Sequence, residues 1–150
     1  MRPRVSTLEV ILANVDGVDR NCLEVILQGT PWVVIDAEPL QIENVVRDAS
    51  VPIVLCDRDH SDCWRRLIRT LMKARRDVCV ILLSSETDPS DYDEVVRCGG
   101  FDILTRPLQR KQVLPMLLFA YTYWRGHGPF LSRRRHACSP AKTLDCVSGD

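Results

Sequence analysis

The chain has 150 residues, of which 45% are hydrophobic and 27% are charged, as in an ordinary globular protein with one core. Lys plus Arg and Asp plus Glu each number 20, so the net charge is zero and gives no reason to expect nucleic acid or an anionic membrane as a partner. No apolar run approaches the roughly 20 residues that span a bilayer, and the N-terminus lacks the apolar block of a signal peptide.

The seven cysteines are an odd number and lie scattered along the chain. Cys22, Cys56 and Cys79 fall inside apolar patterns, where cysteine behaves as a small buried hydrophobic residue. We therefore expect a reduced, cytoplasmic protein.

Short apolar runs alternate along the chain with apolar residues at helical spacing. After a lead-in over residues 1–7, the pattern predicts a strand at 8–13, a helix at 18–28, a strand at 32–35, a helix at 39–48, a strand at 53–56, a helix at 61–75, a strand at 78–83, a helix at 89–98, a strand at 101–105 and a helix at 110–125. The helical spacing predicts that Leu40, Tyr92 and Leu118 face the core, and that Trp64 and Trp124 are packing residues.

Strand and helix alternate five times with short connections, which predicts an α/β fold. We expect a doubly wound, five-stranded parallel sheet with helices on both faces and right-handed crossovers, in a domain spanning residues 7–125. The pattern ends at Gly126. Residues 126–150, which include the basic cluster 133–136, are predicted to be a disordered basic tail.

Three polar residues follow successive predicted strands: Asp57, Ser84 and Arg106. The carboxyl ends of parallel strands meet at one edge of the sheet, so these side chains should converge there. A carboxylate can act as a nucleophile, a hydroxyl can donate to a phosphoryl oxygen, and a cation can offset the added charge. The set therefore suits the binding or transfer of a phosphoryl group.

Residues 7–125 resemble the receiver domain of two-component response regulators. The matching segments are Ile-Val-Leu-Cys-Asp at 53–57, Val-Ile-Leu-Leu-Ser-Ser at 80–85 and Cys-Gly-Gly-Phe-Asp-Ile-Leu-Thr-Arg-Pro-Leu at 98–108, with the family's spacing between Asp57, Ser84 and Arg106. The chain is also similar to short, stand-alone receiver-like proteins of soil bacteria. The resemblance implies a flavodoxin-like (βα)5 fold with strand order 2-1-3-4-5.

The resemblance also implies roles for individual residues. Asp57 would be the phospho-acceptor of a phosphorelay, receiving its phosphoryl group from a sensor histidine kinase. Ser84 would be the switch hydroxyl, and Arg106 would stand at the position of the family's lysine, with a cis bond to Pro107. A Mg²⁺ cofactor would bind Asp57 and the main-chain carbonyl of Asp59.

The sequence departs from the family where the metal would bind. The family places two adjacent acids after the first strand, and the matching positions here are Asn14 and Val15. Asp16 follows, but a shift of one residue at a strand end turns its side chain away, which makes it a weak candidate ligand. Mg²⁺ favours carboxylate oxygens, so these substitutions argue against metal-dependent phosphorylation. Arg106 keeps the family's positive charge and could instead lock Asp57 into an ion pair.

Simpler interpretations remain open for each site residue. Asp57 could cap a loop, Ser84 could bond only to backbone, and Arg106 could be a surface cation before a turn proline. A zinc site could be formed by Cys56, Asp57, His60 and Cys63, although the spacing of these residues matches no recurrent zinc motif. The basic cluster 133–136 is more typical of a solvated tail than of a nucleic-acid contact.

The first functional hypothesis is a single-domain response regulator that signals by docking, without an output domain. The alternative is a degenerate pseudo-receiver, a protein-binding module that works independently of phosphate. For the first hypothesis, the resemblance implies a docking surface over the fourth helix, fifth strand and fifth helix, around residues 92–124, through which a homodimer could form. The sequence does not support an enzyme of the flavodoxin or hydrolase kind. No Gly-rich phosphate-binding loop follows the first predicted strand, and no Ser-His-Asp triad is found in order at the predicted strand ends.

Overall fold

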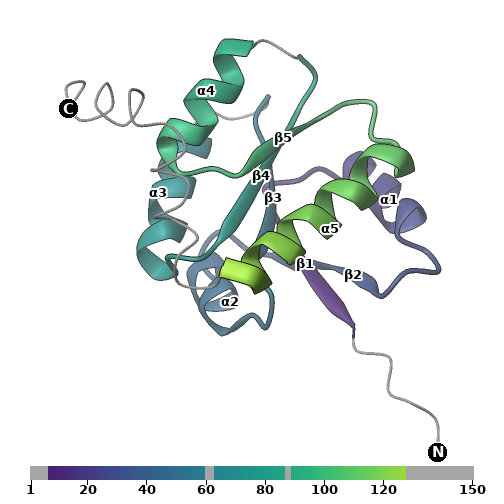
Figure 1. Ribbon diagram of the computed structural model, residues 1–150, viewed down its shortest axis with the longest axis horizontal. Helices are drawn as coiled ribbons and strands as arrows, with labels where there is room; N and C mark the ends of the chain where they lie inside the picture. The colour runs from purple at the N-terminus through teal and green to yellow at the C-terminus, as the bar shows by residue number, and fades with distance from the viewer. Residues whose placement is uncertain (1–6, 60–62, 87–88, 128–150) are drawn as a thin grey trace, which may run out of the picture.

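The computed structural model of the protein describes residues 7–59, 63–86 and 89–127 (Figure 1). Its elements in chain order are β1 (Leu8–Ala13), α1 (Gly17–Ile26), β2 (Trp32–Ala37), α2 (Ile42–Asp48), β3 (Ile53–Asp57), α3 (Trp64–Ala74), β4 (Cys79–Ser84), α4 (Pro89–Cys98), β5 (Asp102–Thr105) and α5 (Arg110–His127). None of the helices in these ranges is both long and apolar enough to cross a membrane.

In the described part of the chain, five strands form one sheet in the order β2-β1-β3-β4-β5, and every neighbouring pair is parallel. Figure 1 shows α1 and α5 on one face of this sheet and α2, α3 and α4 on the other. The predicted doubly wound α/β fold and its strand order are therefore confirmed.

The central strands are apolar throughout because both of their faces are covered. Ile53 and Leu55 of β3 point into the core beneath α1 and α5, whereas Val54 and Cys56 point into the core beneath α2, α3 and α4. Successive side chains of a strand alternate between faces, so a strand buried on both sides needs an unbroken apolar run. This requirement explains why β3 and β4 were recognisable from the sequence.

The helices cover the sheet less completely than the spacing of their apolar residues predicts, and three side chains expected to face the core are exposed. Leu40 is 93% exposed, because α2 begins at Ile42 and Leu40 lies in the preceding turn. Leu118 is also exposed, because it lies about 100° around α5 from Leu117, which faces the sheet. Tyr92 is 45% exposed on α4. The inward positions predicted for these three side chains are wrong.

The bounds of the second and fifth helices differ from the predicted bounds by two or three residues. The second helix begins at Ile42 instead of residue 39, and α5 runs to His127, two residues beyond the predicted end of the domain. Residues 126 and 127 of the predicted tail therefore belong to α5, and residues 128–150 lie outside the described residues. Its disorder stays a prediction.

We expect Gly100→Ala to destabilise the fold. A Cβ atom at Gly100 would lie 2.4 Å from Val95 Cγ1 and 3.0 Å from the Val95 carbonyl oxygen, so α4 would have to move away from β5. Overpacking of this kind costs about 1–3 kcal/mol of unfolding free energy, measurable by urea denaturation. Gly17→Ala is the matched control, because nothing lies within 4 Å of its added Cβ. Equal stability of the two variants would contradict this packing.

Candidate functional site

The ends of three neighbouring strands bring the predicted site residues together. Asp57 is the last residue of β3 and Ser84 is the last residue of β4, and both are buried. Arg106 directly follows β5. Backbone hydrogen bonds continue past the strands, from Arg58 N–H to the Leu83 carbonyl at 3.0 Å and from Arg106 N–H to the Ser84 carbonyl at 2.7 Å. The three side chains are thereby held at one edge of the sheet.

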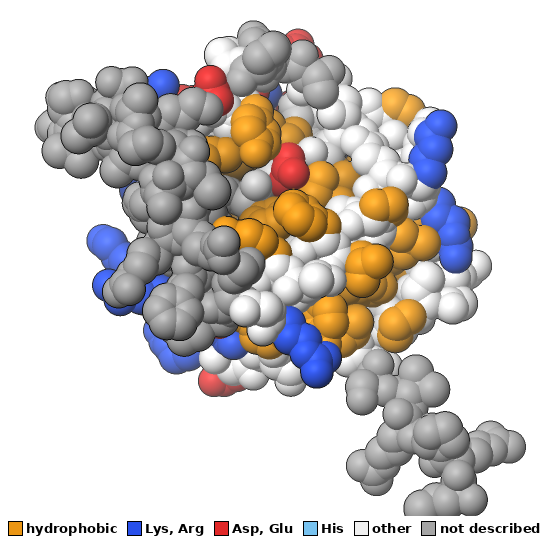
Figure 2. Space-filling view, in the orientation of Figure 1, with side chains coloured by type: hydrophobic (Ala, Val, Ile, Leu, Met, Phe, Trp, Pro, Cys, Tyr) orange, Lys and Arg blue, Asp and Glu red, His pale blue; other side chains and the backbone are white. Residues whose placement is uncertain are grey.

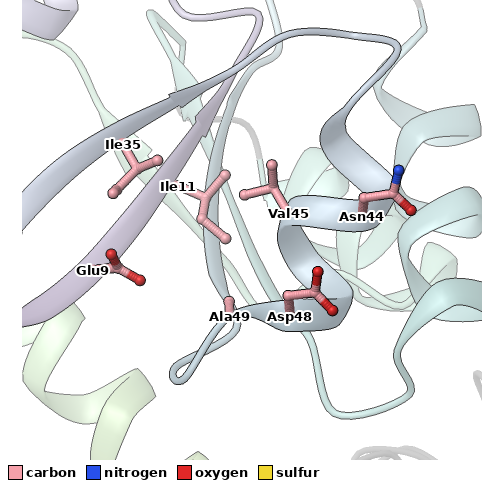
Figure 3. A pocket seen from close by; sticks show the side chains of 7 residues that line it. All are labelled: Glu9, Ile11, Ile35, Asn44, Val45, Asp48 and Ala49. Atoms are coloured by element: carbon pink, nitrogen blue, oxygen red, sulfur yellow. The ribbon is translucent and has the colours of Figure 1, made fainter.

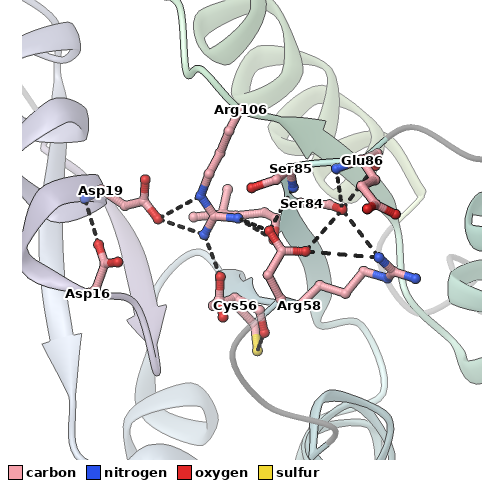
Figure 4. A network of polar contacts seen from close by, with 11 residues as sticks. Asp16, Asp19, Cys56, Arg58, Ser84, Ser85, Glu86 and Arg106 are labelled. Atoms are coloured by element: carbon pink, nitrogen blue, oxygen red, sulfur yellow. Dashed lines mark hydrogen bonds and ion pairs between the residues drawn. The ribbon is translucent and has the colours of Figure 1, made fainter.

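The Arg106 guanidinium is the centre of the site (Figure 4). Its Nε and Nη2 donate to one oxygen of Asp19, at 3.0 and 2.6 Å, and Nη2 also donates to Asp57. Its Nη1 donates to Asp59 at 2.6 Å and to the Leu83 carbonyl at 3.2 Å. These five contacts match the five N–H donors of a guanidinium, so its hydrogen-bonding capacity is fully used.

Charge compensation in the cluster favours the charged form of Arg106. Burial by itself lowers the pKa of this side chain, whereas hydrogen bonds to Asp19 and Asp57 raise it. The net effect is a pKa above the ordinary arginine value. Arg106 is therefore a permanent cation among three carboxylates, those of Asp19, Asp57 and Asp59.

Asp19 is a member of the site that sequence reasoning missed. It lies in the first turn of α1, is buried, and its backbone N–H donates to the Asp16 carboxylate at 2.9 Å. The spacing of Asp16 and Asp19 is that of an N-cap residue and the third helical position, a pattern visible in the sequence. What could not be read from this pattern was the direction of the Asp19 carboxylate, which points to Arg106 instead of back to the cap.

The residues after β1 do not form an acidic metal site. Asp16 is the N-cap of α1, Val15 is half-buried and packs against the core, and Asn14 is exposed with a left-handed φ of 57°. Within residues 7–59, 63–86 and 89–127, no group of three or more His, Cys, Asp or Glu side chains is placed to hold a metal ion. The Arg106 cation lies among the carboxylates that a divalent ion would need. The residues present therefore do not fit a bound Mg²⁺ in this arrangement.

Ser84 is engaged by the backbone of its own turn. Its hydroxyl donates to the Glu86 carbonyl at 2.9 Å and accepts from the Glu86 N–H at 3.2 Å. It also accepts from Arg58 Nη1 at 3.4 Å. Arg58 Nη2 reaches Asp91 at 2.5 Å, so this second arginine, which sequence reasoning also missed, ties the end of β3 to α4.

Asp59 contributes through its side chain. Besides its ion pair with Arg106, its carboxylate accepts a hydrogen bond from the Ser85 N–H at 2.7 Å. The family resemblance implied a role for the main-chain carbonyl of Asp59 as a metal ligand, which stays a prediction. The peptide bond between Arg106 and Pro107 is cis, as expected.

The alternative zinc set is not assembled among the described residues. Cys56 lies in the core beneath α2, α3 and α4, while Cys63 is exposed, and His60 lies outside the described residues. Burial, with a further contribution from Asp57, raises the pKa of the Cys56 thiol to about 12. Zinc binds the thiolate, so this thiol is poorly suited as a ligand.

We expect Arg106→Met to lower the free energy of unfolding by about 3 kcal/mol, because three carboxylates lose their shared cation. Asp57→Ala should cost less, about 1 kcal/mol, since Arg106 keeps Asp19 and Asp59 as partners. Urea denaturation at neutral pH measures both. Arg20→Met is the matched control: Arg20 also pairs with two acids, but at an exposed site where such pairs contribute less than about 1 kcal/mol. Equal losses for Arg106→Met and Arg20→Met would contradict the central role of Arg106.

The fold and the site can be compared with known proteins. No protein-family model matches the sequence, and no curated protein matches it either. Solved structures do match. A response regulator from Thermotoga maritima is 19% identical, with a TM-score of 0.68 over 77% of this chain and 98% of that one. The chemotaxis protein CheY4 of Vibrio cholerae is 15% identical, with a TM-score of 0.65 over 77% of this chain and 99% of that one.

A third similar structure is the beryllofluoride-activated NtrC4 receiver domain dimer, which is 16% identical, with a TM-score of 0.67 over 77% of this chain and 98% of that one. All three superpose on most of the described domain and nearly all of their own length. At these identities the likeness establishes architecture. The chain has the fold of the CheY-like receiver domains of response regulators.

Proposed function

We propose that this protein is a signalling module of receiver fold that acts by docking to protein partners, independently of phosphate. The observation that carries the proposal is the Arg106 cluster, in which all five guanidinium donors are taken by Asp19, Asp57, Asp59 and the Leu83 carbonyl. This corresponds to the pseudo-receiver alternative. Modules of this kind work by binding, and we propose no catalytic turnover.

Electrostatics supports this choice. A phosphoryl group on Asp57 would replace the single charge of the carboxylate with a group that carries between about one and two negative charges and three acceptor oxygens, beside Asp19 and Asp59. Positions 14 and 15, where the family has two metal-binding acids, are Asn and Val in this chain. The negative charge of the phosphoryl group would therefore have to be compensated by Arg106 alone. Its donors are already engaged, and it would have to give up carboxylates to serve the new oxygens.

A second candidate is the phosphorylated switch, and one observation favours it. Asp57 and Ser84 are buried at neighbouring strand ends at the carboxyl edge of the sheet, and a cation already contacts Asp57. In this reaction a carboxylate oxygen of Asp57 attacks the phosphorus of a phosphohistidine, the N–P bond breaks, and the imidazole leaves. The donor would be a sensor histidine kinase.

The partner surface is proposed on α4, β5 and α5. Tyr92 on α4 and Leu118 and Phe119 on α5 are exposed apolar side chains, and Figure 2 shows hydrophobic side chains gathered along this side of the molecule. The Phe119 ring packs against the Phe101 ring at a tilt of 49°, with ring centroids 5.4 Å apart. Partners would be a sensor kinase, another signalling protein or a second copy, as in the NtrC4 receiver dimer. A location in the cytoplasm stays a prediction.

Intact-mass measurement after incubation with a small acyl phosphate and Mg²⁺ separates the two candidates. We expect no added phosphoryl group on the natural chain, because all five N–H donors of Arg106 are already engaged. Asp57→Asn and Asp59→Asn are run alongside as matched variants of the same cluster. An adduct on the natural chain and on Asp59→Asn that disappears in Asp57→Asn would establish the phosphorylated switch instead.

Magnesium binding should appear only when the pocket is rebuilt. We expect the double variant Val15→Asp, Arg106→Lys to bind Mg²⁺ about tenfold more tightly than the natural chain, about 1.4 kcal/mol, because it gains a carboxylate and loses the guanidinium fork. Calorimetric titration measures this, and Val15→Asp alone should gain less. Val18→Asp is the control, since Val18 is 77% exposed on α1. A full gain from Val15→Asp alone would show that Arg106 does not close the pocket.

A further inference from the structure

A hollow of about 330 Å³ lies between α2 and the strands β1 and β2, away from the Arg106 cluster (Figure 3). Figure 3 shows Ile11, Ile35 and Val45 side by side along it, with Glu9 and Asp48 toward its two sides. Asn44 and Ala49 complete the lining. The hollow therefore has an apolar floor and two carboxylates, and no Lys or Arg among the residues that line it.

The hollow exists because α2 is too short to cover the strands beneath it. Its seven residues span about 10 Å at the rise of an α-helix, whereas the six residues of β1 or β2 span about 20 Å. Ile11 pairs with Ile35, and Glu9 pairs with Val33, which is 39% exposed. Apolar sheet surface is thus left uncovered at the outer strands.

An occupant that suits this chemistry is an extended segment with apolar residues followed by cations. The chain contains one such segment beyond α5: Phe130 and Leu131 precede Arg133, Arg134 and Arg135. No Asp or Glu occurs between residue 127 and Asp145. The apolar pair would cover the floor, and the arginines would face the two carboxylates.

The segment begins close enough to reach the hollow. Trp124, near the end of α5, donates to Asp77 at 2.7 Å, Arg75 donates to the same carboxylate at 2.9 Å, and Arg75 also donates to the Ala49 carbonyl. Ala49 caps α2 and lines the hollow. This relay holds the ends of α5 and α2 at the same edge of the sheet. Residues 130–135 lie three to eight residues beyond His127, a reach of about 10–28 Å.

We propose that residues 130–135 of this chain bind in the hollow between α2 and the β1–β2 edge. A short tether gives the segment an effective concentration in the millimolar range, so even weak intrinsic affinity fills the hollow. The proposal does not depend on the function assigned to the Arg106 cluster, which lies at the opposite edge of the sheet.

Site-specific photo-crosslinking in the full chain tests the proposal. Asn44, exposed on the lining of the hollow, is replaced by a benzophenone amino acid, and the products are mapped by mass spectrometry. We expect a crosslink to residues 130–136 at the mass of one chain. The matched control carries the same amino acid at Val25, which is 64% exposed on α1, and should give little of this product.

Charge reversal tests the chemistry. Changing Arg133, Arg134 and Arg135 to Glu alters no residue of the described fold, and should lower the crosslink yield about threefold to tenfold through the loss of surface ion pairs. Asp48→Lys in the reversed chain should restore much of the yield. A crosslink at twice the mass would assign the hollow to a second copy and overturn the proposal. An equal yield from Val25, or a yield unchanged by charge reversal, would overturn it as well.

Discussion

The burial of β3 and β4 on both faces is the constraint on which the rest of the structure depends. These strands contribute side chains to the cores on either side of the sheet, and their backbone ladder continues past the last strand residues. The ladder sets the register of Asp57 against Leu83 and of Ser84 against Thr105. The polar groups at the sheet edge therefore meet because the apolar segments behind them leave the strands no freedom to slide.

At the carboxyl edge of the sheet, the interactions among charged side chains determine which groups can bind there. Three carboxylates brought together in a largely buried site repel one another unless a cation is present. In this chain the cation is Arg106, which carries its charge permanently and matches the carboxylates with its planar fork. Because this cation is a side chain of the protein itself, the negative charge of the three carboxylates is compensated within the chain. The same residue also explains why Asn14 and Val15 can stand where metal ligands would be expected without leaving Asp57 uncompensated.

The two edges of the sheet differ in what holds them. At the carboxyl edge, ion pairs of Arg58 and Arg106 join α1, β3, α4 and the segment after β5, and the same two arginines donate hydrogen bonds to β4. At the amino edge, Asp77 accepts from both Trp124 and Arg75 and so connects the ends of α5 and α2. A change in the Asp57 side chain would therefore act first on Arg106 and, through Asp19, on α1, whereas Arg58 makes the contact with α4.

The sequence by itself determined the strands, their parallel arrangement through the β-α alternation, and the meeting of Asp57, Ser84 and Arg106. Apolar runs and strand ends are local features, and a parallel topology brings such strand ends to one edge, whereas the order of the strands was implied by the family resemblance. It also anticipated the ion pair between Arg106 and Asp57. Only the tertiary structure decided that Asp19 joins the cluster, that Arg58 reaches α4, and that Leu40, Tyr92 and Leu118 face outward. Periodicity tells which side chains share a helix face, but the packing of whole helices on the sheet decides which face is covered and where a long polar side chain finds its partner.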